Sequence, residues 1–263
     1  MPTATNGDVA LHYATDGTGT PVVFVPEAGL GGWSWSFQHG AVARRHRSVV
    51  WDLRGTGHSD SPPGPYDLPT LASDLEAILR AILGEVDARA AHVVGAGLGG
   101  AIALWAARGS SRIASLTLFG TGARAADFDL DPLFAPPDDP TAGRAALERA
   151  LSADFVRNQP ELLETLVEWR AEGDADEAGF RAQIAALDDF DVTEWGYEVT
   201  QPALVCHGTR DELVDPEGGE RLADSLPRGR FEPVEGSGHL VGIDASRAVT
   251  DELLAHLQSV EEG

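Results

Sequence analysis

Short runs of continuous apolar residues alternate along this chain with segments in which apolar residues recur at helical spacing. The helical pattern is found in residues 70–83, 98–107 and 245–257. Strands that are apolar on both faces must be covered on both sides, so this alternation predicts an α/β fold with a mostly parallel, doubly wound sheet. Residues 8–14 alternate polar and apolar side chains, as expected of a leading hairpin. The runs expected to form buried strands are residues 22–25, 48–51, 92–94, 113–119 and 203–205.

The alternation stops after the fourth of these strands, and the segment 123–199 contains no convincing strand. It carries 19 acidic residues against 6 arginines, so its outer surface is expected to be strongly negative. We expect a helical cap over residues 123–199, inserted into a core formed by residues 1–122 and 200–263. Its helical patterns lie near residues 142–156, 160–171 and 177–188.

Residues 93–100, V-V-G-A-G-L-G-G, have the strand, sharp turn and helix start of a nucleophile elbow, G-x-S-x-G. Gly97 stands at the nucleophile position and has no side chain with which to attack. The same residues match the G-x-G-x-x-G pattern of dinucleotide-binding folds. However, the next strand ends in residues 118–121 without the acid that would hold a ribose. We therefore expect an elbow rather than a nucleotide site.

Four further segments place special residues after predicted strands, where ligands bind in open α/β sheets. A glycine-rich loop, P-E-A-G-L-G-G-W, spans residues 26–33, and the backbone N–H groups of such a loop can stabilise a developing oxyanion. The others are D-x-R-G-x-G-x-S at residues 52–59, G-x-x-D at residues 208–211 and S-G-H at residues 237–239. With the elbow and the cap in this order, the chain resembles the α/β-hydrolase superfamily over nearly its whole length.

The resemblance implies an α/β-hydrolase fold and assigns roles to individual residues. His239 corresponds to the catalytic histidine of the family, and Asp211 corresponds to the acid that orients it. The oxyanion hole would be formed by the backbone N–H groups of Ala28 and Leu98, neither of which needs a particular side chain. The resemblance therefore implies a base, an orienting acid and an anion-binding pocket.

Two departures from the family's pattern lie at the expected active centre. Gly97 replaces the nucleophile, and Pro26 and Glu27 replace the usual His-Gly of the oxyanion loop. An engineered change at Gly97 would not explain Glu27, so a natural origin is favoured. Glu27 has two interpretations. Its carboxylate lies beside Gly97 and activates a water molecule or moves a proton, or it forms a salt bridge with Arg54 that joins two loops.

Other candidate site residues are less specific. Trp33 and Trp35 follow the oxyanion loop and either line an apolar substrate cavity or pack in the core. The single cysteine, Cys206, excludes an intrachain disulfide and a multi-cysteine metal site, and it is expected to pack in the core. We expect neither a metal nor a cofactor, because six other histidines show no metal-ligand spacing: His12, His39, His46, His58, His92 and His256.

Three functions remain open, and each implies a small-molecule substrate or ligand. The first is hydrolysis of a small, mostly apolar ester, lactone or related carbonyl compound. Here a water molecule occupies the space at Gly97, and the His239–Asp211 dyad activates it. The second is a cofactor-free lyase, isomerase or decarboxylase in which His239 or Glu27 transfers a proton. The third is a non-catalytic, ligand-binding pseudo-hydrolase.

The charge of the chain excludes several classes of partner. It has 42 acidic and 19 basic residues, a formal net charge of −23, and every basic residue is arginine. This balance excludes a basic nucleic-acid-binding surface and electrostatic docking on anionic membranes. No apolar run approaches the roughly 18 residues of a membrane span, and the N-terminal residues lack a signal-peptide pattern, so the expected compartment is the cytoplasm.

The dispersed carboxylates and the absence of lysine favour a surface adapted to concentrated salt. Near 1 M salt the Debye length falls to about 3 Å, so repulsion between carboxylates costs little. We predict that raising KCl from about 0.1 M to about 1 M raises the midpoint of thermal unfolding. The rise should exceed about 3 °C, the shift that about 1 kcal/mol produces in a chain of this size. Thermal scans at several salt concentrations test this, and stability and solubility that are independent of salt would contradict it.

Overall fold

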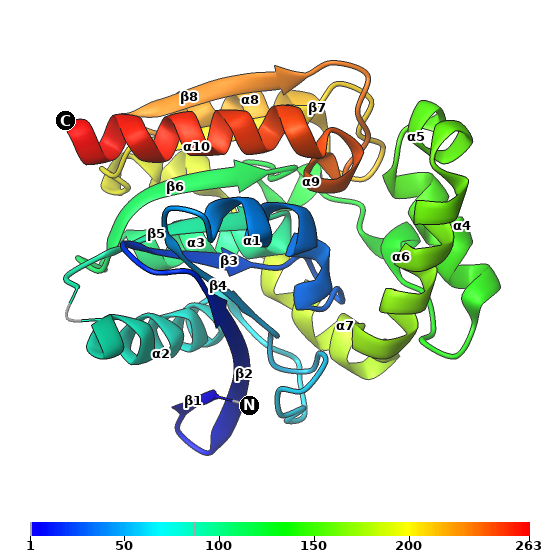
Figure 1. Ribbon diagram of the computed structural model, residues 1–263, viewed down its shortest axis with the longest axis horizontal. Helices are drawn as coiled ribbons and strands as arrows, with labels where there is room; N and C mark the ends of the chain where they lie inside the picture. Colours follow the sequence, from blue (N-terminus) through cyan, green and yellow to red (C-terminus); the bar gives the residue numbers. More distant parts are fainter. Residues whose placement is uncertain (1, 87) are drawn as a thin grey trace.

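The computed structural model describes residues 2–86 and 88–263. They form one eight-stranded sheet in the order β1-β2-β4-β3-β5-β6-β7-β8 (Figure 1). β1 and β2 form an antiparallel hairpin, β2 pairs antiparallel with β4, and the other neighbours are parallel. The strands are β1 (Thr3–Asn6), β2 (Val9–Asp16), β3 (Pro21–Val25), β4 (Arg47–Trp51), β5 (Ala91–Ala96), β6 (Ile113–Phe119), β7 (Ala203–Gly208) and β8 (Gly229–Val234).

Each of the five buried strands expected from the sequence lies within β3 to β7. The sequence did not predict β8, and the reason is its place at the edge of the sheet. Its residues are G-R-F-E-P-V, and only Val234 is buried. An edge strand has one unpaired side, tolerates charged residues and proline, and lacks the continuous apolar pattern of an interior strand.

Alternate residues of the central strands enter two different apolar cores. Val23 and Val25 of β3 belong to the core with α2, α3 and α8, whereas Val22 and Phe24 belong to the core with α1, α9 and α10. In Figure 1, α1 and α10 lie in front of the sheet. The predicted doubly wound α/β-hydrolase fold is confirmed. The helices that cover the two faces are α1 (Ser36–Val42), α2 (Leu68–Val86), α3 (Leu98–Ala107), α8 (Pro216–Ser225), α9 (Val241–Asp244) and α10 (Ser246–Glu262).

Helix α2 shows how the sequence places these elements. Asp67 precedes it and accepts a hydrogen bond from the backbone N–H of Thr70 at 2.9 Å, which satisfies one of the free donors of the first turn. Leu71, Leu75 and Ile82 are fully buried and lie on one face of the helix. The apolar side chains on this face of α2 therefore match the apolar side chains on the face of the sheet that the helix covers.

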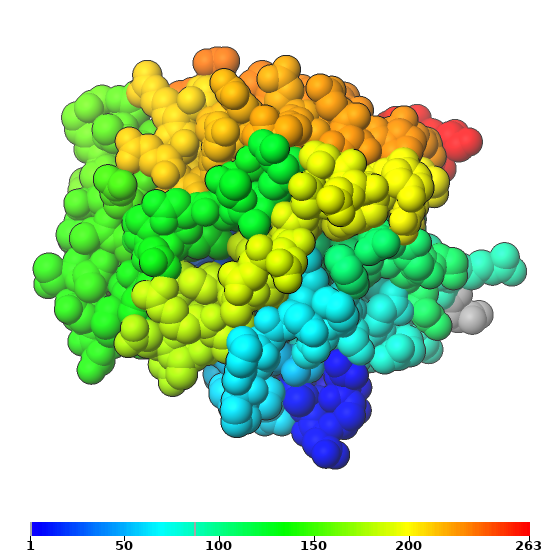
Figure 2. Space-filling model, turned by 180° about the vertical axis from the view of Figure 1, so that it is seen from behind, coloured from blue at the N-terminus to red at the C-terminus, as the bar shows by residue number. Residues whose placement is uncertain are grey.

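All the elements between β6 and β7 are helical, and the α-helices among them occupy the end of the molecule opposite the C-terminus of the chain (Figures 1 and 2). The expected helix near residues 142–156 is two helices, because Leu151 is extended and Ser152 caps a new helix by accepting from Phe155 N. The α-helices are α4 (Pro140–Ala150), α5 (Ala153–Asn158), α6 (Pro160–Gly173) and α7 (Glu177–Ile184). The 3-10 turns are η2 (Ala125–Asp127), η3 (Asp131–Leu133), η4 (Ala185–Leu187), η5 (Val192–Glu194) and η6 (Gly196–Glu198); η1 (Gly32–Trp35) precedes α1.

The order of the strands defines where a ligand site should lie. The chain passes from β3 to β4 on one side and then to β5 on the other, so the connections that leave β3 and β5 diverge at their carboxyl ends. Such a switch point opens a crevice in doubly wound sheets. None of the helices in the described part of the chain is both long enough and apolar enough to span a membrane.

Candidate active site

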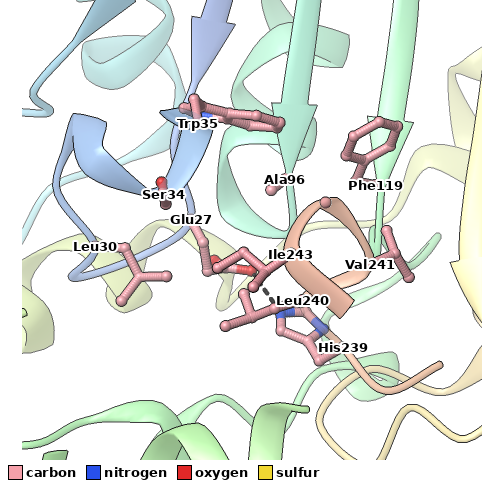
Figure 3. Close-up of a pocket in the computed structure, with 11 residues that line it drawn as sticks. Glu27, Leu30, Ser34, Trp35, Ala96, Phe119, His239, Leu240, Val241 and Ile243 are labelled. Atoms are coloured by element: carbon pink, nitrogen blue, oxygen red, sulfur yellow. Dashed lines mark hydrogen bonds and ion pairs between the residues drawn. The ribbon is translucent and has the colours of Figure 1, made fainter. Parts of the chain in front are cut away.

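Four strands deliver residues to the carboxyl edge of the sheet at the switch point. Glu27 follows β3, Gly97 follows β5, Asp211 follows β7, and His239 follows β8. They are far apart in the sequence, but parallel strands bring their carboxyl ends together. Figure 3 shows Glu27 directed toward His239. The structure therefore brings together the residues that the sequence singled out at this edge.

Gly97 forms the sharp turn between β5 and α3. Its φ is 45° and its ψ is −109°, and its N–H donates to the carbonyl of Phe119 at 2.9 Å. A Cβ atom at this position would lie 1.4 Å from Glu27 Oε2 and 2.3 Å from its Cδ. The Glu27 carboxylate thus occupies the space that a nucleophilic side chain at position 97 would fill.

The Glu27 carboxylate is held by the two expected oxyanion donors. Its Oε1 accepts a hydrogen bond from Ala28 N at 2.6 Å and another from Leu98 N at 2.9 Å. Leu98 is the first residue of α3, so the positive end of the helix dipole also favours an anion here. The carboxylate therefore occupies the predicted oxyanion hole as well as the space at Gly97.

The other oxygen of Glu27 joins it to the histidine and the second acid. Glu27 Oε2 lies 2.9 Å from His239 Nε2 (Figure 3), and His239 Nδ1 lies 2.9 Å from Asp211 Oδ2. Glu27, His239 and Asp211 are 1%, 3% and 8% exposed, so this carboxylate–imidazole–carboxylate chain is almost free of solvent. Buried charges persist only when they are paired and hydrogen-bonded, and here each group is.

Asp211 is fixed by groups that were not identified from the sequence. Its Oδ1 accepts from Leu213 N at 2.8 Å and Val214 N at 2.9 Å. The Nε2 atom of His207, at the end of β7, lies 3.1 Å from Asp211 Oδ2 and 3.0 Å from the Val214 carbonyl oxygen. In the sequence, this role of His207 is indicated by its position four residues before Asp211. His207 braces the acid that orients His239.

The electrostatics of the chain favour a charged histidine between two carboxylates. Burial alone would lower the pKa of His239. The charge and hydrogen bond of Asp211, together with those of Glu27, outweigh burial and raise the pKa to about 10. Burial would likewise raise the pKa of Asp211, but His239 and His207 hold it well below its usual range. His239 is therefore protonated at neutral pH.

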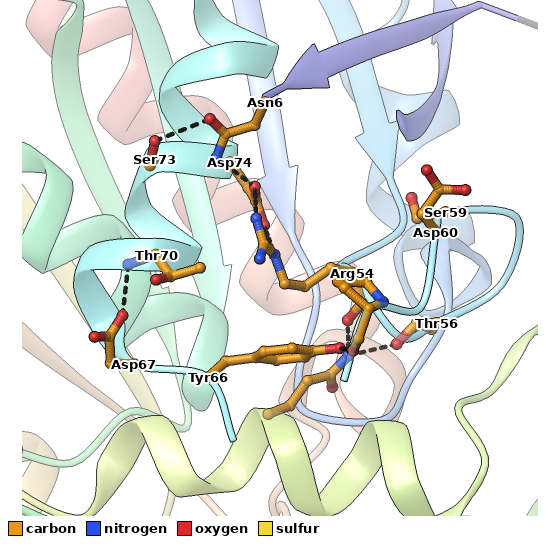
Figure 4. Close-up of polar contacts among 12 residues, drawn as sticks. Asn6, Arg54, Thr56, Ser59, Asp60, Tyr66, Asp67, Thr70, Ser73 and Asp74 are labelled. Carbon is orange, nitrogen blue, oxygen red and sulfur yellow. Dashed lines mark hydrogen bonds and ion pairs between the residues drawn. The ribbon is translucent and has the colours of Figure 1, made fainter. Parts of the chain in front are cut away.

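Two expectations about Glu27 are corrected by these contacts. The water molecule expected at Gly97 has no room there, because the carboxylate fills that space. The salt bridge to Arg54 is not formed. Arg54 Nε and Nη2 instead donate to the two carboxylate oxygens of Asp74 in α2, at 2.5 and 2.6 Å (Figure 4). This bidentate ion pair satisfies the guanidinium group of Arg54, and Glu27 pairs with His239 instead.

A small apolar cavity of about 20 Å³ adjoins Glu27 and His239. This is room for about one water molecule. Trp35 lines it and also packs between Phe24 and Phe119, with ring centroids 5.0 and 5.8 Å apart. Trp33 does not line this cavity. Its Nε1 donates to Asp174 Oδ1 at 2.7 Å, so it contacts the helical insertion instead.

The helical insertion also contacts the oxyanion loop directly through Gln183, which was not singled out in the sequence. Gln183 Oε1 accepts from Gly29 N at 2.7 Å, and its Nε2 donates to the Arg54 carbonyl oxygen and to Thr56 Oγ1. The side chain is fully buried. One amide from α7 thus connects the loops that follow β3 and β4.

The packing of the chain supports neither nucleotide binding at the G-x-G-x-x-G pattern nor nucleophilic attack by Cys206. At Gly95, Gly99 and Gly100 a Cβ atom would approach neighbouring atoms within 2.5 Å or less, so these glycines allow close packing of α3. Burial raises the pKa of the Cys206 thiol to about 12, so Cys206 does not supply a thiolate at neutral pH.

A group of possible metal ligands that includes His12 and His58 lies away from Glu27, although the sequence showed no ligand spacing for these histidines.

Comparison with known proteins agrees with this architecture. The family model for the alpha/beta hydrolase fold matches residues 20–246. The chain is 31% identical to rhodomycin D methylesterase of Streptomyces peucetius, with 98% of this chain and 99% of that protein covered. It is 26% identical to 3-oxoadipate enol-lactonase 2 of Acinetobacter baylyi, with 94% and 92% covered. The crystal structure of an enol-lactonase from Burkholderia xenovorans superposes with a TM-score of 0.82 at 25% identity, with 98% and 100% covered. The chain therefore belongs to the α/β-hydrolase family, and its relatives place it with enzymes of the hydrolase type.

Proposed function

We propose that this chain hydrolyses a small, mostly apolar ester or lactone, with Glu27 acting as the nucleophile in place of an elbow side chain. The observation that carries the proposal is the position of Glu27. One of its oxygens lies at the empty nucleophile site, and the other lies between the two oxyanion donors. The methylesterase and enol-lactonase relatives support an ester or lactone as the substrate class.

The occupied oxyanion hole decides which carbon of the substrate Glu27 attacks. Attack on a carbonyl carbon would create an oxyanion, but Ala28 N and Leu98 N already bind Glu27 Oε1. Attack on the alkyl carbon of the ester creates no oxyanion on the substrate. Glu27 Oε2 forms a bond to that carbon, the carbon–oxygen bond of the ester breaks, and the substrate carboxylate leaves with the electron pair. The product on the enzyme is an ester of Glu27.

The second step uses the same two donors. Once Glu27 is esterified its charge is lost, and with it one of the contributions that raise the pKa of His239. His239 then gives its proton to the departing substrate carboxylate and accepts one from a water molecule that attacks Glu27 Cδ. The oxyanion forms at Oε1, where Ala28 N and Leu98 N are already placed. On collapse, His239 gives this proton to the leaving oxygen and the alcohol departs. The carboxylic acid left at Glu27 then returns a proton to His239, which restores the Glu27 carboxylate and protonated His239.

The size and lining of the cavity restrict the substrate. Its volume of about 20 Å³ is bounded by Leu30, Phe119, Val241 and Ile243, together with Glu27 and His239. An apolar lining favours an apolar alkyl group next to Glu27. Entry of anything larger than water requires the residues that line this cavity to move apart.

Glu27→Gln tests the nucleophile. An amide is a poor nucleophile, so turnover of short methyl esters or five-membered lactones should fall by at least about 1,000-fold, as on loss of other catalytic nucleophiles. Glu232→Gln, a matched change on edge strand β8, should leave turnover unchanged. In a single turnover in H₂¹⁸O, mass spectrometry should find the label in the peptide that contains Glu27 and not in the released acid.

Three results would contradict this mechanism. Label in the acid during the first turnover would show direct attack of water on the carbonyl. Product without label in either place would indicate lyase or isomerase chemistry. Absence of turnover by the wild-type chain across both substrate classes would favour a non-catalytic protein.

Gly97→Ser tests whether Glu27 and an elbow side chain exclude each other. The new Cβ would overlap the Glu27 carboxylate at a residue with positive φ. We expect the free energy of unfolding to fall by about 1–3 kcal/mol, as for other overpacked sites, with no serine esterase activity. The control Gly109→Ser has no atom within 4 Å of its Cβ and should cost little. The double variant Gly97→Ser with Glu27→Gly frees both oxyanion donors and should gain activity on activated acyl esters. A single Gly97→Ser variant as stable as the wild type would contradict the overlap.

The raised pKa of His239 predicts how stability changes with pH. The folded chain holds one more proton than the unfolded chain between about pH 6.5 and pH 10. This contribution to stability is therefore complete below pH 6.5 and is lost as pH rises through about 10, at up to about 1.4 kcal/mol per pH unit. Urea unfolding of the wild type and of His239→Gln should converge over this range. An NMR titration of His239 with a midpoint near pH 6.5 would contradict the prediction.

A further inference from the structure

Three potential metal ligands meet away from Glu27, where β2 and β4 lie side by side (Figure 1). His12 lies in β2, Asp52 follows β4, and His58 lies on the turn after it. One ligand atom from each lies within 4.8 Å of the other two. The register of β2 and β4 explains why His12 and Asp52 lie close together. Tyr13 pairs with Trp51, so the next positions along the antiparallel pair are His12 and Asp52, and Asp52 N donates to the His12 carbonyl oxygen at 3.0 Å.

Two of the three distances between the ligand atoms are close to those around a coordinated ion. His12 Nδ1 is 3.3 Å from Asp52 Oδ2, and His58 Nδ1 is 3.7 Å from the same oxygen. A tetrahedral zinc ion with bonds of about 2.0–2.1 Å holds its ligand atoms about 3.3–3.5 Å apart. His58 is the most exposed of the three, with 64% of its side chain accessible, so it is able to make the small adjustment that remains.

The carboxylate at the centre of this group is already oriented by its surroundings. Asp52 Oδ1 accepts from Gly32 N at 3.0 Å, and Oδ2 accepts from His58 N at 3.0 Å. Ser59 Oγ donates to the Asp52 carbonyl oxygen and accepts from His12 N, which joins the two strands. A Cβ at Gly57 would lie 2.5 Å from Asp52 Oδ2, so the turn can approach the carboxylate only at a glycine. Such supporting contacts orient metal ligands in known sites.

The three ligands open onto a cavity of about 380 Å³, which Trp33, Trp169 and Glu172 also line. Two imidazoles and one carboxylate leave a coordination position for water or a small ligand. The net charge of −23 adds a long-range attraction for cations. The cavity is therefore large enough for a ligand on the ion, whereas the cavity at Glu27 is not.

We infer that His12, Asp52 and His58 bind one divalent transition-metal ion, for which zinc is the best match in ligand type and spacing, with an open position toward this cavity. The ion bridges β2 and the turn after β4. It is independent of Glu27 chemistry, because none of its ligands contacts Glu27, His239 or Asp211 in the hydrogen bonds of the described residues.

The test is titration of the chelator-treated full chain with Zn²⁺ at pH 7.5 by calorimetry, and with Co²⁺ by visible absorption. We expect one high-affinity equivalent and the spectrum of four-coordinate Co²⁺. His58→Gln should weaken Zn²⁺ binding by more than about 100-fold, which exceeds the 10- to 100-fold loss that follows removal of a merely supporting partner. The matched variant His256→Gln should bind as the wild type does.

Because the His58 side chain is exposed, its variant should fold as the wild type does, and a circular dichroism spectrum checks this directly. Stoichiometric binding that His58→Gln leaves unchanged, or no binding below about 100 μM, a Kd far weaker than structural zinc sites show, would overturn the inference. Neither result bears on the role of Glu27, since the readout does not involve turnover.

Discussion

The hydrogen bonds that hold the Glu27 carboxylate organise the active centre of this chain. Two backbone N–H groups bind one oxygen, and His239 binds the other. Removing this carboxylate would leave a protonated imidazole facing an apolar cavity, and removing the imidazole would leave two buried carboxylates without a cation. A buried charge that loses its partner is strongly destabilising. Glu27, His239 and Asp211 are consequently one electrostatic unit, although they come from three different strand ends.

The surrounding fold supplies the geometry that this unit needs. The turn at Gly97 directs the first N–H of α3 toward the carboxylate, and the loop after β3 directs the Ala28 N–H to the same oxygen. Asp211 is fixed by two backbone donors and by His207. Gln183 connects the helical insertion to the oxyanion loop. Together these contacts restrict the carboxylate to one orientation.

The sequence was sufficient for the parts of the fold that are buried on both faces. The five interior strands were predicted because a short, continuous apolar run is typical of a strand covered on both sides, whereas β8 was missed because an edge strand has no such pattern. The division of one expected helix at Ser152 depends on a cap that only the local backbone reveals. The position of an element with a continuous buried apolar pattern is thus easier to predict from sequence than the position at which an element ends or is interrupted.

The residues of the candidate site also fall into those that the sequence predicts and those that it does not. Asp211 and the two N–H donors could be located because each follows a predicted strand, and His239 could be located from its S-G-H motif. The direction of the Glu27 side chain could not, since its partners Leu98 and His239 are separated from it by 71 and 212 residues. His12 and Asp52 meet only through the register of an antiparallel pair. Contacts between distant segments depend on register and rotamer, and neither is visible in a single sequence.

The overlap between position 97 and the Glu27 carboxylate also imposes an order on the history of this site. A chain with glutamate at position 27 and any side chain at position 97 would place two groups in one space. A chain with glycine at position 97 and a smaller residue at position 27 would have an open pocket and no clash. The route from an ordinary elbow that avoids this overlap loses the side chain at position 97 before it gains the glutamate. The return route without overlap runs through the same intermediate, which has neither the glutamate nor an elbow nucleophile, so the two kinds of catalytic centre are separated on this route by a chain that lacks both groups.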